Sequence, residues 1–124
     1  MDTLRVLLVD DQPSILMLVR ALLEHTLPAV DVRTAGSAQD ALAILCRESY
    51  DVVLSDVSMP GGTGFFLLAE ARRRWPSLRV VLMSGAPVAG EAQAAGADAF
   101  LSKPFTAEQV HAALSLLPAG CTPL

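Results

Sequence analysis

Five polar residues stand just after short apolar runs, and their types suit phosphoryl chemistry. They are Asp10, Asp11, Asp56, Ser84 and Lys103. Carboxylates that converge on one crevice resist ionising unless a cation lies among them. A hard cation such as Mg²⁺ prefers oxygen ligands of this kind, while an ammonium and a hydroxyl can bind a tetrahedral anion. The set therefore predicts a magnesium-assisted phosphoryl site.

Asp56 is the predicted carrier of the phosphoryl group. Residues 61–64, Gly-Gly-Thr-Gly, do not have the spacing of a nucleotide-binding glycine loop, and no Gly-Lys-Ser/Thr sequence occurs in the chain. Nucleotide binding therefore has no support from these motifs. A lone carboxylate can itself act as the nucleophile and form an aspartyl phosphate.

The apolar runs that precede these residues predict five buried strands. Residues 6–9, 52–54 and 80–83 are continuously apolar, and residues 30–32 and 99–101 are weaker cases. Continuous rather than alternating apolarity is typical of strands that are covered on both faces, as in a parallel sheet.

Helical patterns separate the runs. A helix is predicted from Pro13 to the stop at Pro28, and two capping boxes at residues 37–40 and 106–109 open others. Residues 65–75 form a further predicted helix, and residues 88–95 a short one. The expected buried positions of three helices are Ile15, Leu18, Val19, Leu22 and Leu23, then Ala41, Leu42 and Leu45, then Val110, Ala113, Leu114 and Leu117.

Strands that alternate with helices predict an α/β fold with right-handed crossovers. We expect a doubly wound three-layer α/β/α sandwich around a five-stranded parallel sheet of order 2-1-3-4-5. In such a sheet ligands bind at the carboxyl ends of the strands, between strands 1 and 3. The five polar residues all lie at those ends.

Composition limits the protein class. The chain has 124 residues, 52% of them hydrophobic, and a net charge of −4, which favours one globular domain and disfavours non-specific nucleic-acid binding. No apolar run is long enough to span a bilayer, and the first residues do not resemble a signal peptide. Cys46 and Cys121 form no C-x-x-C pair and suit a reducing compartment. A soluble cytoplasmic protein is expected.

Four stretches together resemble the receiver domains of two-component response regulators, a family with the flavodoxin-like architecture expected above. The stretches are residues 8–11 (LVDD), 56–60 (DVSMP) with Gly64, 83–85 (MSG) and 96–105 (GADAFLSKPF). Each is weak alone, but four in order at matching strand ends are specific. The resemblance covers nearly the whole chain, as a receiver domain over residues 1–118 and a short tail over residues 119–124.

The resemblance implies a role for each site residue. Asp56 would accept a phosphoryl group from a sensor histidine kinase or a histidine phosphotransfer protein. Asp10 and Asp11 would hold Mg²⁺ with Asp56 and the backbone carbonyl of Ser58. Ser84 and Lys103 would bind phosphoryl oxygens, and Ser84 would also take part in switching. Phe100 matches the family's aromatic switch position, and the Lys103–Pro104 bond resembles its cis peptide.

The chain departs from the family pattern in two places. Gly62 and Thr63 stand where the family usually has a large apolar and an acidic residue, so a more mobile loop is expected. Pro87 and Gly90 lie in a segment about a turn shorter than usual, so the fourth helix is expected to be short or irregular.

Structural roles remain open for several of these residues. Asp10 and Asp11 could cap the helix at Pro13, and Asp56 could be a turn residue. Phe100 could be a fixed half-buried aromatic. Arg72, Arg73 and Arg74 are expected to form a solvated helix end, His25 and His111 to be surface residues, and Trp75 to lie at the edge opposite the site.

The residues favour a non-enzymatic receiver over three rival functions. This receiver is either free-standing or part of a hybrid kinase, and it signals to an unknown protein without binding nucleic acid or membrane. An aspartyl-phosphate phosphatase needs a second carboxylate two residues after the nucleophile, where this chain has Ser58. A non-phosphorylated interaction module would be expected to lack an acid or the lysine. A flavin carrier would need aromatic residues at the strand ends.

Overall fold

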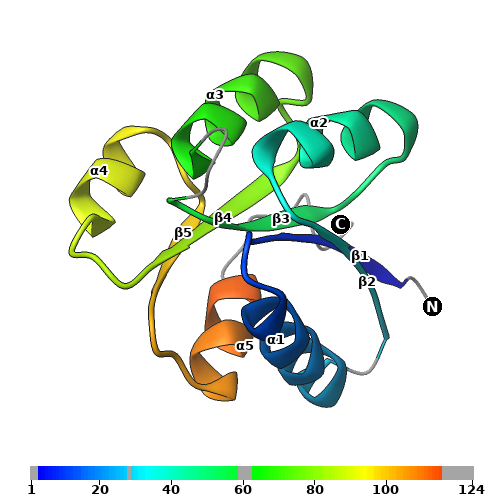
Figure 1. Cartoon of the computed structure of the whole chain (residues 1–124), viewed down its shortest axis with the longest axis vertical. Helices are drawn as coiled ribbons and strands as arrows, with labels where there is room; N and C mark the ends of the chain where they lie inside the picture. Colours follow the sequence, from blue (N-terminus) through cyan, green and yellow to red (C-terminus); the bar gives the residue numbers. More distant parts are fainter. Residues whose placement is uncertain (1–2, 28, 59–62, 116–124) are drawn as a thin grey trace.

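The computed structural model describes residues 3–27, 29–58 and 63–115. Strands and helices alternate along these residues, as the sequence predicts (Figure 1). The elements are β1 (Leu4–Val9), α1 (Pro13–Thr26), β2 (Val30–Ala35), α2 (Ala38–Arg47), β3 (Val52–Asp56), α3 (Gly64–Arg74), β4 (Arg79–Ser84), α4 (Ala89–Ala94), β5 (Ala99–Ser102) and α5 (Ala107–Ser115).

The five strands form one parallel sheet. Their order is β2-β1-β3-β4-β5, which confirms the predicted topology. Helices α2, α3 and α4 cover one face and α1 and α5 cover the other, so the molecule has three layers (Figure 1). The chain reverses its winding direction between β1 and β3, whose carboxyl ends lie side by side at the edge where ligands are expected.

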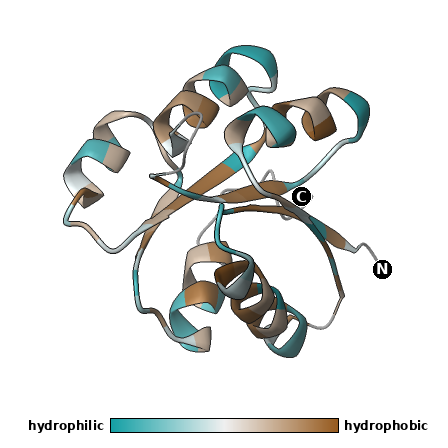
Figure 2. Ribbon diagram, in the orientation of Figure 1, coloured by the Kyte–Doolittle hydropathy of each residue, from teal (hydrophilic) through white to brown (hydrophobic). Residues whose placement is uncertain are grey.

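Neighbouring strand residues point to opposite faces of the sheet, and this divides the core in two. Leu7 and Val9 pack beneath α2 and α3, whereas Val6 and Leu8 pack against α1 and α5. All four side chains are completely buried. Figure 2 shows the resulting hydrophobic strands between the two helical layers. Burial on both faces explains why the strands read as continuous apolar runs.

The predicted helix starts are borne out by hydrogen bonds. The Ser37 hydroxyl accepts from the Asp40 N–H at 3.0 Å. At α5 the capping box is reciprocal, because Thr106 Oγ1 accepts from the Gln109 N–H and Gln109 Oε1 accepts from the Thr106 N–H. Thr63, noted as a departure from the family, accepts from the Phe66 N–H and begins α3.

One predicted core position in α1 is wrong. Val19 and Leu23 are buried as expected, but Leu18 is 57% exposed. Successive helix residues are about 100° apart, so Leu18 lies at the edge of the stripe centred on Val19 and Leu23 and does not reach the sheet. In α2 and α5 most of the predicted core positions are buried, namely Ala41, Leu45, Val110, Ala113 and Leu114. Leu42 is only partly buried. Leu117 lies outside the described residues.

The expected solvated end of α3 is also only partly right. Arg73 is exposed, but Arg72 crosses to the segment before β5, where its Nη2 lies 2.6 Å from Asp98 Oδ2. Its Nη1 also donates to the carbonyl of Leu78 at 2.7 Å. Asp98 accepts in addition from the N–H of Val80. Arg72 therefore joins α3 to the starts of β4 and β5, a contact that helix-end patterning cannot reveal.

The other expectations about helix α4, the Lys103–Pro104 bond and the two histidines are confirmed. Helix α4 has six residues, as the shortened segment predicts, and the Lys103–Pro104 peptide bond is cis. His25 and His111 are exposed. Cys46 is a free exposed thiol, whereas Gly62, Cys121 and the tail at residues 119–124 lie outside the described residues. Among the helices that the structure describes, none has the length and apolar character needed to cross a membrane.

Candidate functional site

The three predicted acidic residues meet at the carboxyl ends of β1 and β3. Asp10 and Asp11 directly follow β1, and Asp56 is the last residue of β3. Each offers a carboxylate oxygen, and these three atoms all lie within 4.8 Å of one another. Asp10 is completely buried, Asp56 is partly buried and Asp11 is exposed. The convergence expected from the sequence is therefore present in the fold.

Lys103 lies between two of these carboxylates. Its Nζ atom is 3.1 Å from Asp10 Oδ2 and 3.3 Å from Asp56 Oδ1. The other oxygen of Asp10 accepts from the N–H of Gln12 at 3.0 Å. Each oxygen of the buried Asp10 carboxylate thus has a polar partner, so neither is left buried without a hydrogen bond or an ion pair.

The pKa of the Asp56 carboxyl is raised above its ordinary value. Burial is the main cause, and the nearby charge of Asp10 adds to it. The positive charge of Lys103 acts in the opposite direction and favours the ionised carboxylate. A carboxylate with these neighbours would gain from a second cation.

The donor set fits a divalent magnesium ion. All three candidate ligands are hard carboxylate oxygens, which Mg²⁺ prefers, and the exposed Asp11 leaves one side open to the water molecules that this ion retains. Three carboxylates against one ammonium leave two negative charges, so a divalent cation would balance the site. Ser58 is described and exposed, but residues 59–62 that follow it are not described, so the part of its carbonyl stays a prediction.

Ser84 and Lys103 come from neighbouring strands and are joined through the backbone. The Lys103 N–H donates to the carbonyl of Ser84 at 2.8 Å. Ser84 is the last residue of β4 and is 6% exposed, and its hydroxyl accepts from the N–H of Ala86 at 3.0 Å. Phe100 is half-buried in β5 and packs on the core beneath α4. The roles of Ser84 and Phe100 in switching stay predictions.

Two residues next to Asp56 were not assigned a role from the sequence. Ser55 is a completely buried polar residue on β3, and its hydroxyl donates to the Asp56 carbonyl at 2.9 Å. Gly64 opens α3 so close to the same carbonyl that a Cβ atom there would lie 2.4 Å from the oxygen. A hydroxyl between the apolar run of residues 52–54 and Asp56 is the one signal that could have indicated Ser55.

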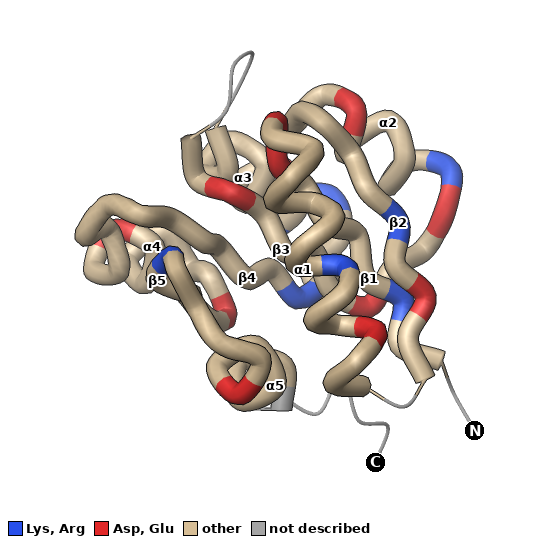
Figure 3. Tube along the Cα trace, turned by 60° about the horizontal axis from the view of Figure 1, so that its bottom comes forward, with Lys and Arg blue, Asp and Glu red and all other residues tan. Residues whose placement is uncertain are grey.

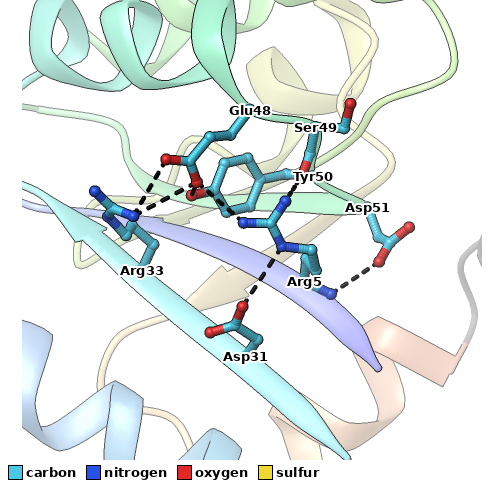
Figure 4. A network of polar contacts seen from close by, with 7 residues as sticks. All are labelled: Arg5, Asp31, Arg33, Glu48, Ser49, Tyr50 and Asp51. Carbon is cyan, nitrogen blue, oxygen red and sulfur yellow. Dashed lines mark hydrogen bonds and ion pairs between the residues drawn. The ribbon is translucent and has the colours of Figure 1, made fainter. Parts of the chain in front are cut away.

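The opposite end of the sheet carries a separate polar network (Figure 4). Arg5 lies over the ring of Tyr50, 4.5 Å from its centre, and contacts Glu48 at 3.0 Å. Trp75 lines a cavity with Tyr50 and Leu78 at this end, as its predicted place opposite the site requires.

Figure 3 shows basic and acidic residues interspersed along the described chain.

Comparisons with known proteins agree with this geometry. Residues 6–115 match the family profile described as "Response regulator receiver domain". The chain is 44% identical over 86 residues to response regulator protein FleR of Pseudomonas aeruginosa, covering 67% of the chain and 17% of FleR. It is 36% identical to response regulator protein PilR of the same organism, covering 84% of the chain and 24% of PilR.

A sensor kinase is also similar. The sensor histidine kinase RcsC of Escherichia coli is 34% identical over 120 residues, covering 93% of the chain and 12% of RcsC. The chain therefore spans less than a quarter of the length of each of these curated relatives.

Two solved structures share the fold at nearly full length. Chemotaxis response regulator CheY4 of Vibrio cholerae has a TM-score of 0.84 at 30% identity, with 94% of this chain and 99% of that one covered. Response regulator protein TrrA of Thermotoga maritima, solved in complex with Mg(2+)-BeF, has a TM-score of 0.85 at 25% identity, with 93% and 99% covered.

Proposed function

The chain belongs to the response regulator receiver domain family, and on this premise we propose that Asp56 accepts a phosphoryl group from a phosphohistidine partner. The observation that supports this most directly is the arrangement at the carboxyl ends of β1 and β3. Three carboxylates lie close together there, and the Lys103 ammonium contacts two of them. Asp56 is partly exposed and its Oδ1 atom lies 3.3 Å from Lys103 Nζ, so a phosphodonor can reach it and a cation stands beside it.

In the proposed reaction a carboxylate oxygen of Asp56 attacks the phosphorus atom. The new P–O bond forms as the P–N bond to the partner's imidazole breaks, and the imidazole leaves with the electron pair and takes up a proton. Lys103 supports the reaction before and after transfer, because it favours the ionised form of Asp56 and can then bind a phosphoryl oxygen. Ser84 would supply a hydroxyl hydrogen bond to another phosphoryl oxygen.

Asp10, Asp11, Asp56 and the backbone carbonyl of Ser58 are the proposed magnesium ligands. When bound, Mg²⁺ supplies the positive charge that offsets the charge of the transferred phosphoryl group. The chain's own contribution is to hold the carboxylates together: Asp10 is fixed by Gln12 and Lys103, and Asp56 by its place at the end of a central strand.

The proposed receiver covers residues 1–118, with residues 119–124 as a tail. It is proposed to act in the cytoplasm as a non-enzymatic signalling domain that catalyses only its own phosphorylation and dephosphorylation. The proposed phosphodonor is a sensor histidine kinase or a histidine phosphotransfer protein, and the output is altered binding of a further protein. An interaction module that is never phosphorylated is the second candidate, but such a module would be expected to lack an acid or the lysine, and this chain keeps Asp10, Asp11, Asp56 and Lys103.

Intact-mass analysis with a small phosphodonor and Mg²⁺ tests the proposal. We expect the wild-type chain to gain one phosphoryl group and Asp56→Asn to gain none. Asp51→Asn is the matched control, since Asp51 directly precedes the same strand at its other end. Undiminished phosphorylation of Asp56→Asn would exclude Asp56 as the acceptor, and an unmodified wild type would favour the interaction module.

A further inference from the structure

A buried hydroxyl lies directly beside the proposed phosphoacceptor. Ser55 is completely buried in β3, on the face that packs beneath α2 and α3 with Val53 and Val57. Its hydroxyl donates to the backbone carbonyl of Asp56 at 2.9 Å. A hydroxyl is costly to bury without a partner, and the partner that Ser55 has is the Asp56 carbonyl. We therefore look for the role of the Ser55 hydroxyl in what it does to the Asp56 carbonyl.

The peptide unit between Asp56 and Val57 is held at both of its polar atoms. Its N–H, from Val57, donates to the carbonyl of Met83 in β4 at 2.9 Å. Its carbonyl, from Asp56, accepts from Ser55. A peptide unit is planar, so two hydrogen bonds at its opposite sides fix its rotation about the chain axis.

Helix α3 begins against this peptide unit and donates a hydrogen bond to the next one along the chain. The N–H of Gly64 donates to the carbonyl of Val57 at 2.8 Å. A Cβ at Gly64 would lie 2.4 Å from the Asp56 carbonyl oxygen and 3.0 Å from the Val57 Cα, so the helix start and the strand end are in direct contact. Rotation of the Asp56 carbonyl would therefore disturb the start of α3 as well as the direction of the Asp56 side chain.

We propose that Ser55 is a positioning residue for phosphoryl acceptance, which acts by fixing the Asp56–Val57 peptide unit and with it the Asp56 carboxylate. This inference rests on the proposed function of Asp56. Group transfer depends steeply on the placement of the nucleophile, and a displacement of about 1 Å can slow a reaction by about a hundredfold. The hydrogen bond of the Ser55 hydroxyl goes to the backbone carbonyl of Asp56, so the proposed effect on the carboxylate passes through the backbone.

Three variants separate positioning from general stability. Ser55→Ala removes only the hydroxyl oxygen, and Ser55→Thr restores a hydroxyl at the same atom. Val32→Ala is the matched control, because Val32 is buried in the edge strand β2, in the part of the core on the other face of the sheet. Its truncation lowers stability without touching β3 or α3.

Two measurements are made on each variant. The first is the rate of phosphorylation by acetyl phosphate with Mg²⁺, and the second is the set of backbone amide NMR shifts without metal or phosphodonor. For Ser55→Ala we expect a rate lower by about tenfold and shift changes at Val57 and Gly64, which report the two neighbouring hydrogen bonds. Ser55→Thr should recover most of the rate, and Val32→Ala should lose thermal stability but keep the wild-type rate.

A wild-type rate in Ser55→Ala would overturn the inference, as would an equal loss of rate in Val32→Ala. If Ser55→Ala proves insoluble, Ser55→Cys replaces it, because a thiol is a weaker donor and should slow phosphorylation to a smaller extent. A wild-type chain that takes up no phosphoryl group would refute the proposed function instead. The amide shifts would then decide by themselves whether Ser55 positions the peptide unit, since unchanged Val57 and Gly64 amides in Ser55→Ala would contradict it.

Discussion

Lys103 Nζ lies 3.1 Å from Oδ2 of Asp10, a residue 93 positions earlier in the chain whose side chain is completely buried. The contact joins the residue that follows β1 to the residue that follows β5, two strands that are not neighbours in the sheet. Without Lys103 the Asp10 carboxylate would lose its charged partner inside the protein, which is costly. The same ammonium reaches Asp56 at 3.3 Å, so one side chain balances both acids.

Lys103→Arg should keep the fold but weaken the response to phosphorylation. An ammonium is compact enough to contact two carboxylates from one point, whereas the wider planar guanidinium of Arg needs a different arrangement of acceptors. On phosphorylation we expect fewer backbone amide NMR signals to shift in Lys103→Arg than in the wild type. Arg20→Lys, at an exposed ion pair on α1, is the control for the exchange of the two side chains. Shift changes equal to wild type in Lys103→Arg would contradict this role.

Asp11→Ala should weaken magnesium binding by about tenfold or more, because the ion loses a charged oxygen ligand. Asp40→Ala is the matched control. Asp40 is an exposed carboxylate at the start of α2, at the same end of the sheet, but it does not belong to the cluster of three. Calorimetric titration measures the magnesium affinity of both variants. An equal loss of affinity in Asp11→Ala and Asp40→Ala would mean that the ion is attracted only by the overall negative charge at this end of the sheet.

Ser84→Ala should still be phosphorylated on Asp56 but should transmit less of the change to Phe100. The Ser84 hydroxyl accepts from the Ala86 N–H at 3.0 Å, so its movement toward a phosphoryl oxygen would release the loop that precedes α4. One charge-assisted hydrogen bond contributes about 1.5 to 3 kcal/mol, enough to shift a two-state equilibrium by about ten- to a hundredfold.

The Ser84 prediction is checked by NMR with and without beryllofluoride, a phosphoryl mimic, in the presence of Mg²⁺. In the wild type we expect perturbation at Phe100 and along α4, and in Ser84→Ala a much smaller one. An unchanged Phe100 ring in the wild type would mean that the signal leaves through another surface and that Phe100 is a fixed half-buried aromatic.

The polar network at the far end of the sheet should make stability depend on pH through Glu48 (Figure 4). Hydrogen bonds from Tyr50 and from Arg5 lower the pKa of the Glu48 carboxyl below its ordinary value of 4.5. A lowered folded-state pKa stabilises the fold above the ordinary value, and this contribution is lost as the pH falls through the folded-state pKa.

Glu48→Gln keeps a carbonyl acceptor for Tyr50 and Arg5 but removes the titrating group. We expect its melting temperature to fall less than that of the wild type between about pH 6 and about pH 3. Glu24→Gln, at an exposed ion pair within α1, is the control. Parallel melting curves for wild type and Glu48→Gln across this range would show that the network makes no pH-dependent contribution.

Much of the fold could be predicted because its signals are local. Runs such as residues 6–9 are apolar on both faces, and Ser37 and Thr106 begin helices through hydrogen bonds that span three residues. Parallel strands bring their carboxyl ends to one edge, so the neighbourhood of Asp10, Asp11, Asp56, Ser84 and Lys103 followed from order along the chain. Each of these inferences needs only short-range patterning and the rule for parallel crossovers.

The tertiary structure alone decided which atoms meet. The exposure of Leu18 depends on how α1 is rotated against the sheet, and the pairing of Arg72 with Asp98 depends on a long side chain that crosses between elements. The contact of Gly64 with the Asp56 carbonyl and the hydrogen bond from Ser55 depend on a fit of a few tenths of an ångström between a strand end and a helix start. Side-chain reach and helix rotation are set by packing between elements distant in sequence, so residue types and spacing cannot specify them.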